Sequence, residues 1–357
     1  MSKMVLWVLL IVLIVFRAYQ LRPNFIDGSR IRINQERIKS EPLVFEKSQQ
    51  IKILGLKAYL PSFPSANYGD IVTLEGRVNL KKKTLEDTKL IEIKKGGFLF
   101  GIREKILNFY QSVLPEPHSS LVAGMVLGSK SSLPSWFWDE LKKTGTAHVV
   151  VASGMNVTLV AGFLISFLIL FVRRPVALII SLVFIWFYAF LSGFDAPIIR
   201  ACLMATISFS AVIFGRMSFA LKALFYTFFI MLVFNPYYIF DVGFILSFAA
   251  TLSLILFGRK IDNKLKFIPK FLREGFSTSL SAQILVAPIL YFTFGYFSIW
   301  SPIINGLVLW VVLYITVLGM ISSVFVFLSP LLARILLLLT YPLTYFFISV
   351  VSLFARL

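Results

Sequence analysis

Cysteine and histidine are almost missing from this chain of 357 residues, which has one Cys and two His. The single cysteine, Cys202, cannot form a disulfide within the chain, so the sequence leaves the redox compartment open. His118 and His148 are too few and too far apart for an HExxH zinc motif or the histidine-rich metal cluster of a metallo-β-lactamase. We therefore expect no metal site, no cofactor and no enzymatic activity.

Acidic residues are also scarce, because 17 Asp and Glu stand against 35 Lys and Arg and give a formal net charge of +18. Hydrophobic residues make up 58% of the chain, more than the roughly 45–50% of soluble proteins. This composition predicts a membrane protein. Excess positive charge in such a protein is typical of cytoplasmic loops, or of contact with a polyanion such as lipid headgroups or nucleic acid.

Long apolar segments follow residue 146 and predict a polytopic α-helical membrane protein with about eight spans. They lie near residues 147–172, 175–194, 196–214, 218–235, 237–257, 277–297, 303–328 and 331–355. Residues 1–21 hold a shorter apolar run behind Lys3, which we interpret as an additional N-terminal membrane anchor. Basic loops at 173–174, 216–222 and 259–273 fall on one side of the alternating spans, so the positive-inside rule places them and the N-terminus in the cytoplasm.

Residues 22–97 differ in kind, because they are charged and contain short stretches in which apolar and polar residues alternate. Such stretches lie at 30–33, 50–54, 71–78 and 90–93, and turn residues separate them. They predict a small all-β, OB-like domain, which the topology places outside the cytoplasm. We interpret residues 98–146 as amphipathic helices at the membrane interface and residues 147–357 as the polytopic channel domain.

The β domain offers basic and aromatic side chains that suit a nucleic acid. The candidates for DNA contact are Lys81, Lys82, Lys83, Arg77, Phe63 and Tyr68. The three consecutive lysines could also touch lipid phosphates, or simply form the solvated tip of a hairpin. The sequence leaves these alternatives open.

Polar residues within or at the ends of the apolar segments are the candidates for a polar translocation pathway. They are His148, Ser153, Asn156, Asp195, Arg200, Asp241, Ser247, Gln283 and Asn305. An arginine at membrane depth costs at least about 2.5–3.5 kcal/mol, so Arg200 should face a partner or water. It is either a structural ion-pair partner of Asp195 or Asp241, or a positive element of the pathway.

His148 and Ser153 could suggest a hydrolytic site made of a base and a nucleophile. Residues five positions apart on a helix do not face each other squarely, and no carboxylate lies nearby in the sequence to orient the histidine. We therefore favour a closely packed helix start, at which Gly154 lets another backbone approach.

Four stretches together resemble the ComEC family, the inner-membrane channel of bacterial competence. The similar stretches are residues 127–157, with Thr144-Gly145-Thr146-Ala147-His148 and Ser153-Gly154; residues 193–204, with Arg200-Ala201; residues 236–251, with Gly243-Phe244-Ile245-Leu246-Ser247-Phe248; and residues 283–305, with Gln283, Pro288 and Asn305. The similarity runs from about residue 120 to the C-terminus. A weaker similarity joins residues 28–97 to the family's extracytoplasmic OB-like domain.

The resemblance implies a protein of the bacterial inner membrane that passes single-stranded DNA into the cytoplasm during natural transformation. It implies an extracytoplasmic DNA receptor and a cytoplasmic helicase-like ATPase as partners. Many members carry a metallo-β-lactamase-like domain that is proposed to degrade the other strand, and here we expect a separate nuclease to do so. The alternatives are a small-molecule or lipid transporter with an accessory β domain, and a membrane enzyme acting at His148 and Ser153.

Overall fold

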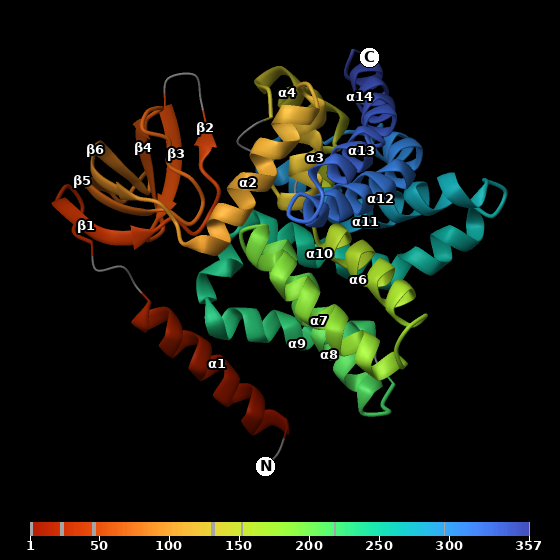
Figure 1. Cartoon of the computed structure of the whole chain (residues 1–357). Helices are drawn as coiled ribbons and strands as arrows, with labels where there is room; N and C mark the ends of the chain where they lie inside the picture. The colour runs from red at the N-terminus through yellow and green to blue at the C-terminus, as the bar shows by residue number, and fades with distance from the viewer. Residues whose placement is uncertain are drawn as a thin grey trace.

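The computed structural model describes residues 3–21, 25–44, 48–129, 133–150, 153–217, 219–295 and 297–356. A β domain lies beside a larger helical body, and the N-terminal helix α1 (Lys3–Gln20) extends below both (Figure 1). Along its length α1 packs against α9 (Ala220–Phe234) and against the 3₁₀ turn η1 (Pro236–Phe240). Arg17 and Tyr237 add hydrogen bonds between α1 and this part of the body.

The β domain is a single mixed sheet of six strands, with the order β1-β5-β6-β4-β3-β2. The strands are β1 (Arg30–Arg37), β2 (Leu43–Val44), β3 (Ser48–Ile53), β4 (Leu56–Pro61), β5 (Ile71–Asn79) and β6 (Thr84–Lys94). Neighbouring strands are antiparallel except β4 and β6, which pair in parallel. Each of the four stretches predicted from alternation overlaps a strand, and their buried side chains form one core.

Two strands, β2 and β4, are additional to those predicted. In β4 buried and exposed residues alternate without exception. A two-residue turn joins it to β3, and both residues of this turn, Leu54 and Gly55, have positive φ angles of 50° and 83°. Such a turn matches the twist of a hairpin, but it usually carries Asn-Gly or Asp-Gly. The Leu-Gly pair explains why turn chemistry did not separate β3 from β4 in the sequence.

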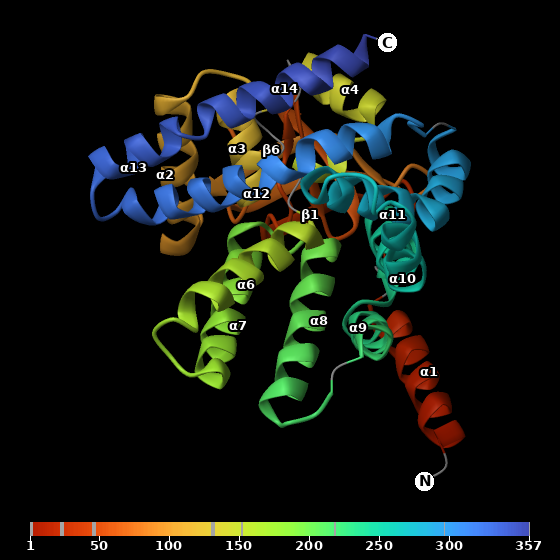
Figure 2. The ribbon, with the colours of Figure 1, turned by 90° about the vertical axis from the view of Figure 1, so that its right-hand side faces the viewer.

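The helical body contains both long and short helices. They are α2 (Phe98–Val113), α3 (His118–Leu127), α4 (Ser135–Thr144), α5 (Ala147–Val150), α6 (Gly154–Leu168), α7 (Arg174–Leu191), α8 (Ala196–Ile213), α10 (Val242–Lys264), α11 (Lys270–Phe294), α12 (Ser301–Phe325), α13 (Pro330–Leu338) and α14 (Tyr341–Ala355), with α9 and η1 between α8 and α10. In Figure 2, α6, α7 and α8 run side by side, while α12 and α14 cross above them.

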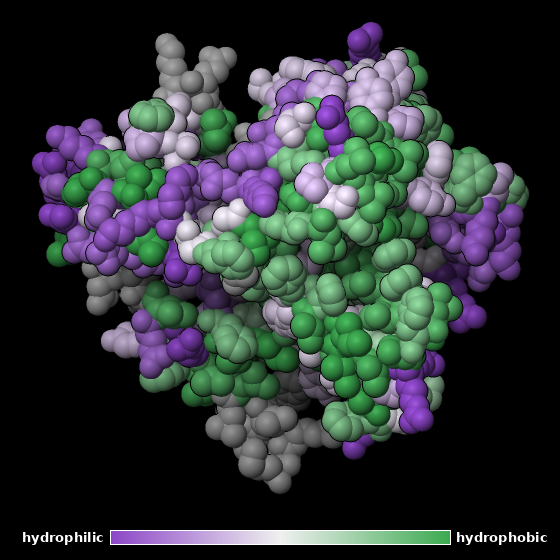
Figure 3. Space-filling view, in the orientation of Figure 1, coloured by the Kyte–Doolittle hydropathy of each residue, from purple (hydrophilic) through white to green (hydrophobic). Residues whose placement is uncertain are grey.

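Among the described residues, six helical stretches are long and apolar enough to cross a membrane, so the protein is a multi-pass membrane protein. They are 174–191, 196–213, 242–264, 270–293, 301–325 and 330–355. Of the other predicted spans, 147–172 is divided into α5 and α6, and the apolar helix of 218–235 covers only 15 residues. A helix of 15 residues is about 22 Å long, shorter than a hydrocarbon core of about 30 Å. The described surface agrees with a lipid environment, because hydrophobic residues cover much of the helical body (Figure 3).

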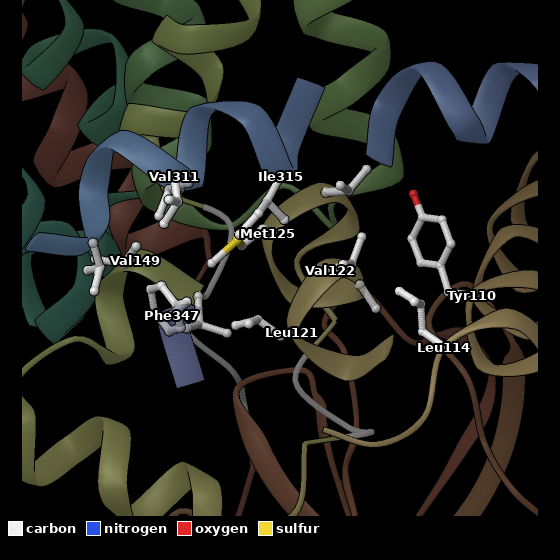
Figure 4. Packing of buried hydrophobic residues seen from close by; sticks show 14 of the residues in the cluster. Tyr110, Leu114, Leu121, Val122, Met125, Val149, Val311, Ile315 and Phe347 are labelled. Atoms are coloured by element: carbon white, nitrogen blue, oxygen red, sulfur yellow. The ribbon is translucent and has the colours of Figure 1, made fainter. Parts of the chain in front are cut away.

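The largest core joins α2, α3, α5, α12 and α14 (Figure 4). All ten residues of α3 are buried, and Leu121, Val122 and Met125 contact side chains from the surrounding helices. Residues 118–127 therefore lie inside the helical body, although the sequence analysis placed the whole of 98–146 at the membrane interface. Small residues such as Ala123 and Gly124 allow this close packing, since a Cβ added to Gly124 would lie 2.7 Å from the Val150 carbonyl oxygen.

Candidate functional site

Arg200 lies in the first turns of α8 and is buried, with 9% of its surface exposed. Its guanidinium donates a hydrogen bond to the Thr251 hydroxyl on α10 and lies 3.9 Å from the Met204 sulfur. The salt bridges between described residues include none of Arg200, so the structure does not support the alternative of an ion pair with Asp195 or Asp241. The Arg200 Nε atom is buried and has no hydrogen-bond partner in the described part of the chain.

Two other predicted pathway residues, Ser153 and Ser247, neighbour residues that lie next to this guanidinium. A Cβ added to Gly154, the first residue of α6, would lie 2.3 Å from the terminal Nη2 of Arg200, so a larger residue would require the guanidinium to move. Ser153 precedes Gly154 at the helix start, and the Ser247 carbonyl on α10 accepts a hydrogen bond of 2.9 Å from Thr251. We call Ser153, Gly154, Arg200, Ser247 and Thr251 the Arg200 cluster.

A second group forms where α11 meets α12, and it contains three further predicted residues. Asn305 is fully buried and donates to the hydroxyls of Ser279 and Ser301, over 2.8 and 3.1 Å. Gln283 reaches the Ser298 carbonyl at 3.4 Å. Gly145 packs against Ser298 and Ser301, and its carbonyl oxygen lies 2.9 Å from the exposed His148 Nδ1. We call His148, Gln283, Ser298, Ser301 and Asn305 the Asn305 cluster.

Asn156 belongs to neither cluster, because it caps the buried C-terminal end of α3. Its Nδ2 donates a 2.9 Å hydrogen bond to the Met125 carbonyl in the last turn of α3. The last four carbonyls of a helix have no partner within the helix, and a buried end must find partners elsewhere. Arg103 of α2 donates to the neighbouring Leu127 carbonyl at 3.3 Å, so two side chains satisfy the end of α3.

Asp195 and Asp241 stand at the N-caps of α8 and α10. The Asp241 Oδ1 accepts a 2.9 Å hydrogen bond from the Phe244 amide, which is ordinary capping chemistry. Both carboxylates lie near Tyr238 of η1. Burial raises the pKa of the Tyr238 phenol, and the charges of Asp241 and then Asp195 raise it further. These two acids therefore form a negative rim at the helix starts, separate from Arg200.

The paired base and nucleophile that His148 and Ser153 could suggest are not brought together. The His148 Nδ1 lies next to the Gly145 carbonyl, and the Ser153 hydroxyl lies 3.5 Å from Asn156 Oδ1. Among the described residues, no three His, Cys, Asp or Glu side chains gather in a way that could hold a metal ion.

Five of the six DNA-contact candidates are placed at the surface of the β domain. Lys81, Lys82 and Lys83 form the exposed β5–β6 turn, where Lys82 lies 3.7 Å from Glu86. Arg77 is exposed on β5, and Phe63 is 87% exposed in the connection after β4. These side chains are free to meet a ligand, but they do not converge in a groove among the described residues.

Tyr68 is instead buried where the β domain meets the helices. Its hydroxyl donates to the Phe190 carbonyl at 3.2 Å, and its ring packs edge-on against Phe100 with the centroids 5.3 Å apart. The Arg103 guanidinium lies 5.5 Å from the Tyr68 ring centroid. In this position the ring is covered by protein and docks the β domain onto α2 and α7.

Arg103 and Glu41 form the centre of this contact, and the sequence analysis did not single out either. Arg103 Nη2 lies 3.2 Å from Glu41 Oε1, and the two side chains are only 8% and 12% exposed. Arg103 Nε donates to the Leu191 carbonyl at 2.9 Å, and the Ser129 hydroxyl donates to Glu41 at 2.6 Å. Arg103 lies within the segment that the sequence analysis interprets as amphipathic helices, and its position next to the apolar Ile102 carries no signal of burial.

Comparison with known proteins identifies a family and several relatives. The sequence model of the family described as "Competence protein" matches residues 125–357, well over half of the chain. ComE operon protein 3 of Bacillus subtilis (strain 168) is 30% identical over 210 residues, which are 58% of this chain and 26% of that protein. No solved structure matches.

Two uncharacterized proteins are also similar. One from Aquifex aeolicus is 30% identical over 224 residues, or 61% of this chain and 53% of its own length. The protein YcaI of Escherichia coli (strain K12) is 27% identical over 240 residues, which are 64% of this chain and 32% of YcaI. The chain thus spans between about a quarter and about half of the length of these relatives.

Proposed function

Because the chain belongs to the Competence protein family, we propose that it acts in DNA uptake, as a channel that passes single-stranded DNA across the bacterial inner membrane. The similarity to ComE operon protein 3 supports this proposal. Since the chain covers 26% of that protein, the activity of the whole relative does not transfer automatically.

The observation that carries the proposal is the environment of Arg200. It is a buried cation between helices of the membrane body, hydrogen-bonded to a neutral hydroxyl and not paired with a carboxylate in the described chain. A buried charge is costly unless something compensates it. A passing phosphate would supply the missing negative charge and would accept a hydrogen bond from the unpartnered Nε. The other predicted pathway residues belong to the same proposal.

DNA uptake in a deletion strain tests this role of Arg200. We expect wild type to restore transformants and Arg200→Gln to reduce them at least about tenfold, the loss expected when a charged hydrogen bond is removed. Arg200→Lys should restore part of the uptake, because it keeps the charge without the planar fork. Arg216→Gln, in an exposed loop, is the matched control at equal membrane levels. Full uptake with Arg200→Gln would refute the pathway role.

The β domain fits this proposal as an OB-like module outside the membrane. The sheet order β1-β5-β6-β4-β3, with β4 and β6 parallel, agrees with an OB barrel in which β1 and β3 do not pair with each other. The short β2 is then an extra edge strand next to β3. We propose Lys81, Lys82, Lys83, Arg77 and Phe63 as its DNA contacts, and assign Tyr68 to docking because its ring is covered. Affinity of the full chain for a single-stranded oligonucleotide should fall steeply with salt.

Replacing the three lysines of the β5–β6 turn by glutamine should weaken this binding and flatten its salt dependence, since each released counterion contributes to the slope. Equal slopes for wild type and the triple variant would remove the turn from the binding surface. The orientation, with a cytoplasmic N-terminus, and the partners, namely a DNA receptor, a helicase-like ATPase and a separate nuclease, are further parts of the proposal. They rest on loop charge and on family membership.

A further inference from the structure

The end of the α10–α11 hairpin carries an open, charged cavity that has no role in the proposed DNA passage. Its volume is about 520 Å³, within the roughly 300–1,000 Å³ of small-ligand clefts. In Figure 1 this teal hairpin reaches the right-hand edge of the helical body, and a hydrophilic patch lies over it in Figure 3. The residues that line this cavity include Leu254, Gly258, Arg259, Asp262, Arg273 and Glu274.

The charge of this region is strongly positive after its ion pairs are counted. Both acids in the lining already form ion pairs, since Asp262 lies 3.1 Å from Arg273 and Glu274 lies 3.9 Å from Lys270. None of the described ion pairs includes Arg259, although it lines the cavity and is exposed. Lys260, Lys264 and Lys266 are also exposed on the same hairpin end. The cavity therefore favours an anion, and Arg259 presents a fork suited to phosphate.

The surroundings of the cavity are those of a membrane surface. Its deeper wall contains Leu254, in the apolar part of α10 that is long enough to span a membrane. Phe267 and Phe271, which are 82% and 58% exposed, lie at the hairpin end outside the cavity lining. Exposed aromatic side chains next to basic residues at the end of an apolar helix are typical of the headgroup level of a bilayer. A soluble polyanion would explain the lysines but not the apolar wall.

We propose that this cavity binds the headgroup of an anionic phospholipid. Arg259 holds the phosphate, the Arg273–Asp262 pair borders the polar part of the headgroup, and Leu254 contacts the start of an acyl chain. Basic pockets between membrane helices commonly hold such headgroups. The site is independent of DNA uptake, so either proposal can fail without the other.

Native mass spectrometry of the intact detergent-solubilised protein, given equal amounts of phosphatidylglycerol and phosphatidylcholine, tests the site. We expect wild type to retain phosphatidylglycerol preferentially, and Arg259→Gln to bind it at least about tenfold more weakly, as for loss of a charged hydrogen bond. Gly258→Leu tests the cavity without changing a charge, because a Cβ at Gly258 meets nothing within 4 Å and the side chain would fill the open space. It should weaken binding similarly.

Two matched variants serve as controls. Gly162→Leu also adds a side chain to a helical glycine with open space, on α6, and Arg216→Gln removes a charge from another basic loop. Both should retain phosphatidylglycerol like wild type. Equal retention of the two lipids, or normal retention by Gly258→Leu, would overturn the proposal. Displacement of the lipid by inorganic phosphate would identify a free-anion site, and displacement by a single-stranded oligonucleotide would identify a nucleic-acid site; either result also overturns it.

Discussion

Removal of the Arg103 guanidinium should release the β domain from the helical body. Arg103→Ala removes the Arg103 guanidinium from the largely buried Glu41 carboxylate, and it removes the donors to the carbonyls of Leu127 and Leu191. Breaking one side of a buried ion pair costs about 3–5 kcal/mol. The cost of the broken ion pair falls on docking, because Glu41 belongs to the β domain and Arg103 to α2 of the helical body, whereas the bonds to the two carbonyls lie within that body.

A loss of about 3 kcal/mol raises the population of the undocked state about 150-fold. Glu41→Gln should cost less, about 1–2 kcal/mol, because an amide oxygen still accepts from Arg103 and Ser129. The double variant should be little worse than Arg103→Ala alone, since both changes remove the same interaction. This order of effects separates a shared ion pair from two independent contributions to stability.

Limited trypsin digestion of the full chain measures the undocked population. Lys94, the last residue of β6, and Lys95, in the connection to α2, are exposed, and cleavage after them requires this part of the chain to loosen, so it should be faster in Arg103→Ala. Glu104→Ala is the matched control, because Glu104 is half-exposed and 3.9 Å from Lys95, a contact that contributes no more than about 1 kcal/mol. Unchanged cleavage in Arg103→Ala, or additive effects in the double variant, would refute the reasoning.

Two further predictions concern α3. Asn156→Leu should lower stability by about 1–3 kcal/mol, because it leaves the buried Met125 carbonyl unpaired; a thermal midpoint equal to wild type would contradict this. Burial lowers the pKa of His118 below the unfolded value of about 6.5, and the negative charge of Glu116 raises it by a smaller amount. The unfolded state therefore binds more protons, and stability should be full above about pH 6.5 and decrease as the pH falls toward the lower folded pKa. His118→Phe, which keeps a ring over Tyr341, should reduce this acid sensitivity of the thermal midpoint.

The features that repeat along the sequence were predictable, and the features that depend on single distant contacts were not. Alternation located β1, β3, β5 and β6, and apolar length located α7, α8 and α10. The burial of α3 could have been suspected, since its ten residues carry no Lys, Arg, Asp or Glu and include small residues such as Gly124. Nothing local distinguishes Arg103 from an exposed arginine, because its partner Glu41 lies 62 positions away, on the other domain.

The burial of Arg200 was predictable from the sequence, but its partner was not. Its position inside an apolar segment predicted that it faces a partner or water, and its guanidinium donates a hydrogen bond to the neutral Thr251 hydroxyl. The sequence left open whether Arg200 pairs with Asp195 or Asp241 or is a positive element of a pathway. Both acids stand at helix N-caps, where the first amides and the positive end of the helix dipole favour negative charge. The Asp241 carboxylate accepts from the Phe244 amide, so helix capping accounts for its position, while Asp195 stands at the N-cap of α8 without such a bond.

Glycines contact both polar clusters, Gly145 at the Asn305 cluster and Gly154 at the Arg200 cluster. Gly145 has a φ of 70° and would place a Cβ 3.0 Å from the Ser301 Cβ, beside Asn305. Gly154 would place one 2.3 Å from the Arg200 guanidinium. Both glycines therefore lie in close contact with a neighbouring helix, Gly145 with α12 and Gly154 with α8. Arg200 Nε and Asn305 Oδ1 are buried and have no hydrogen-bond partner among the described residues, so each cluster keeps an unused hydrogen-bonding atom.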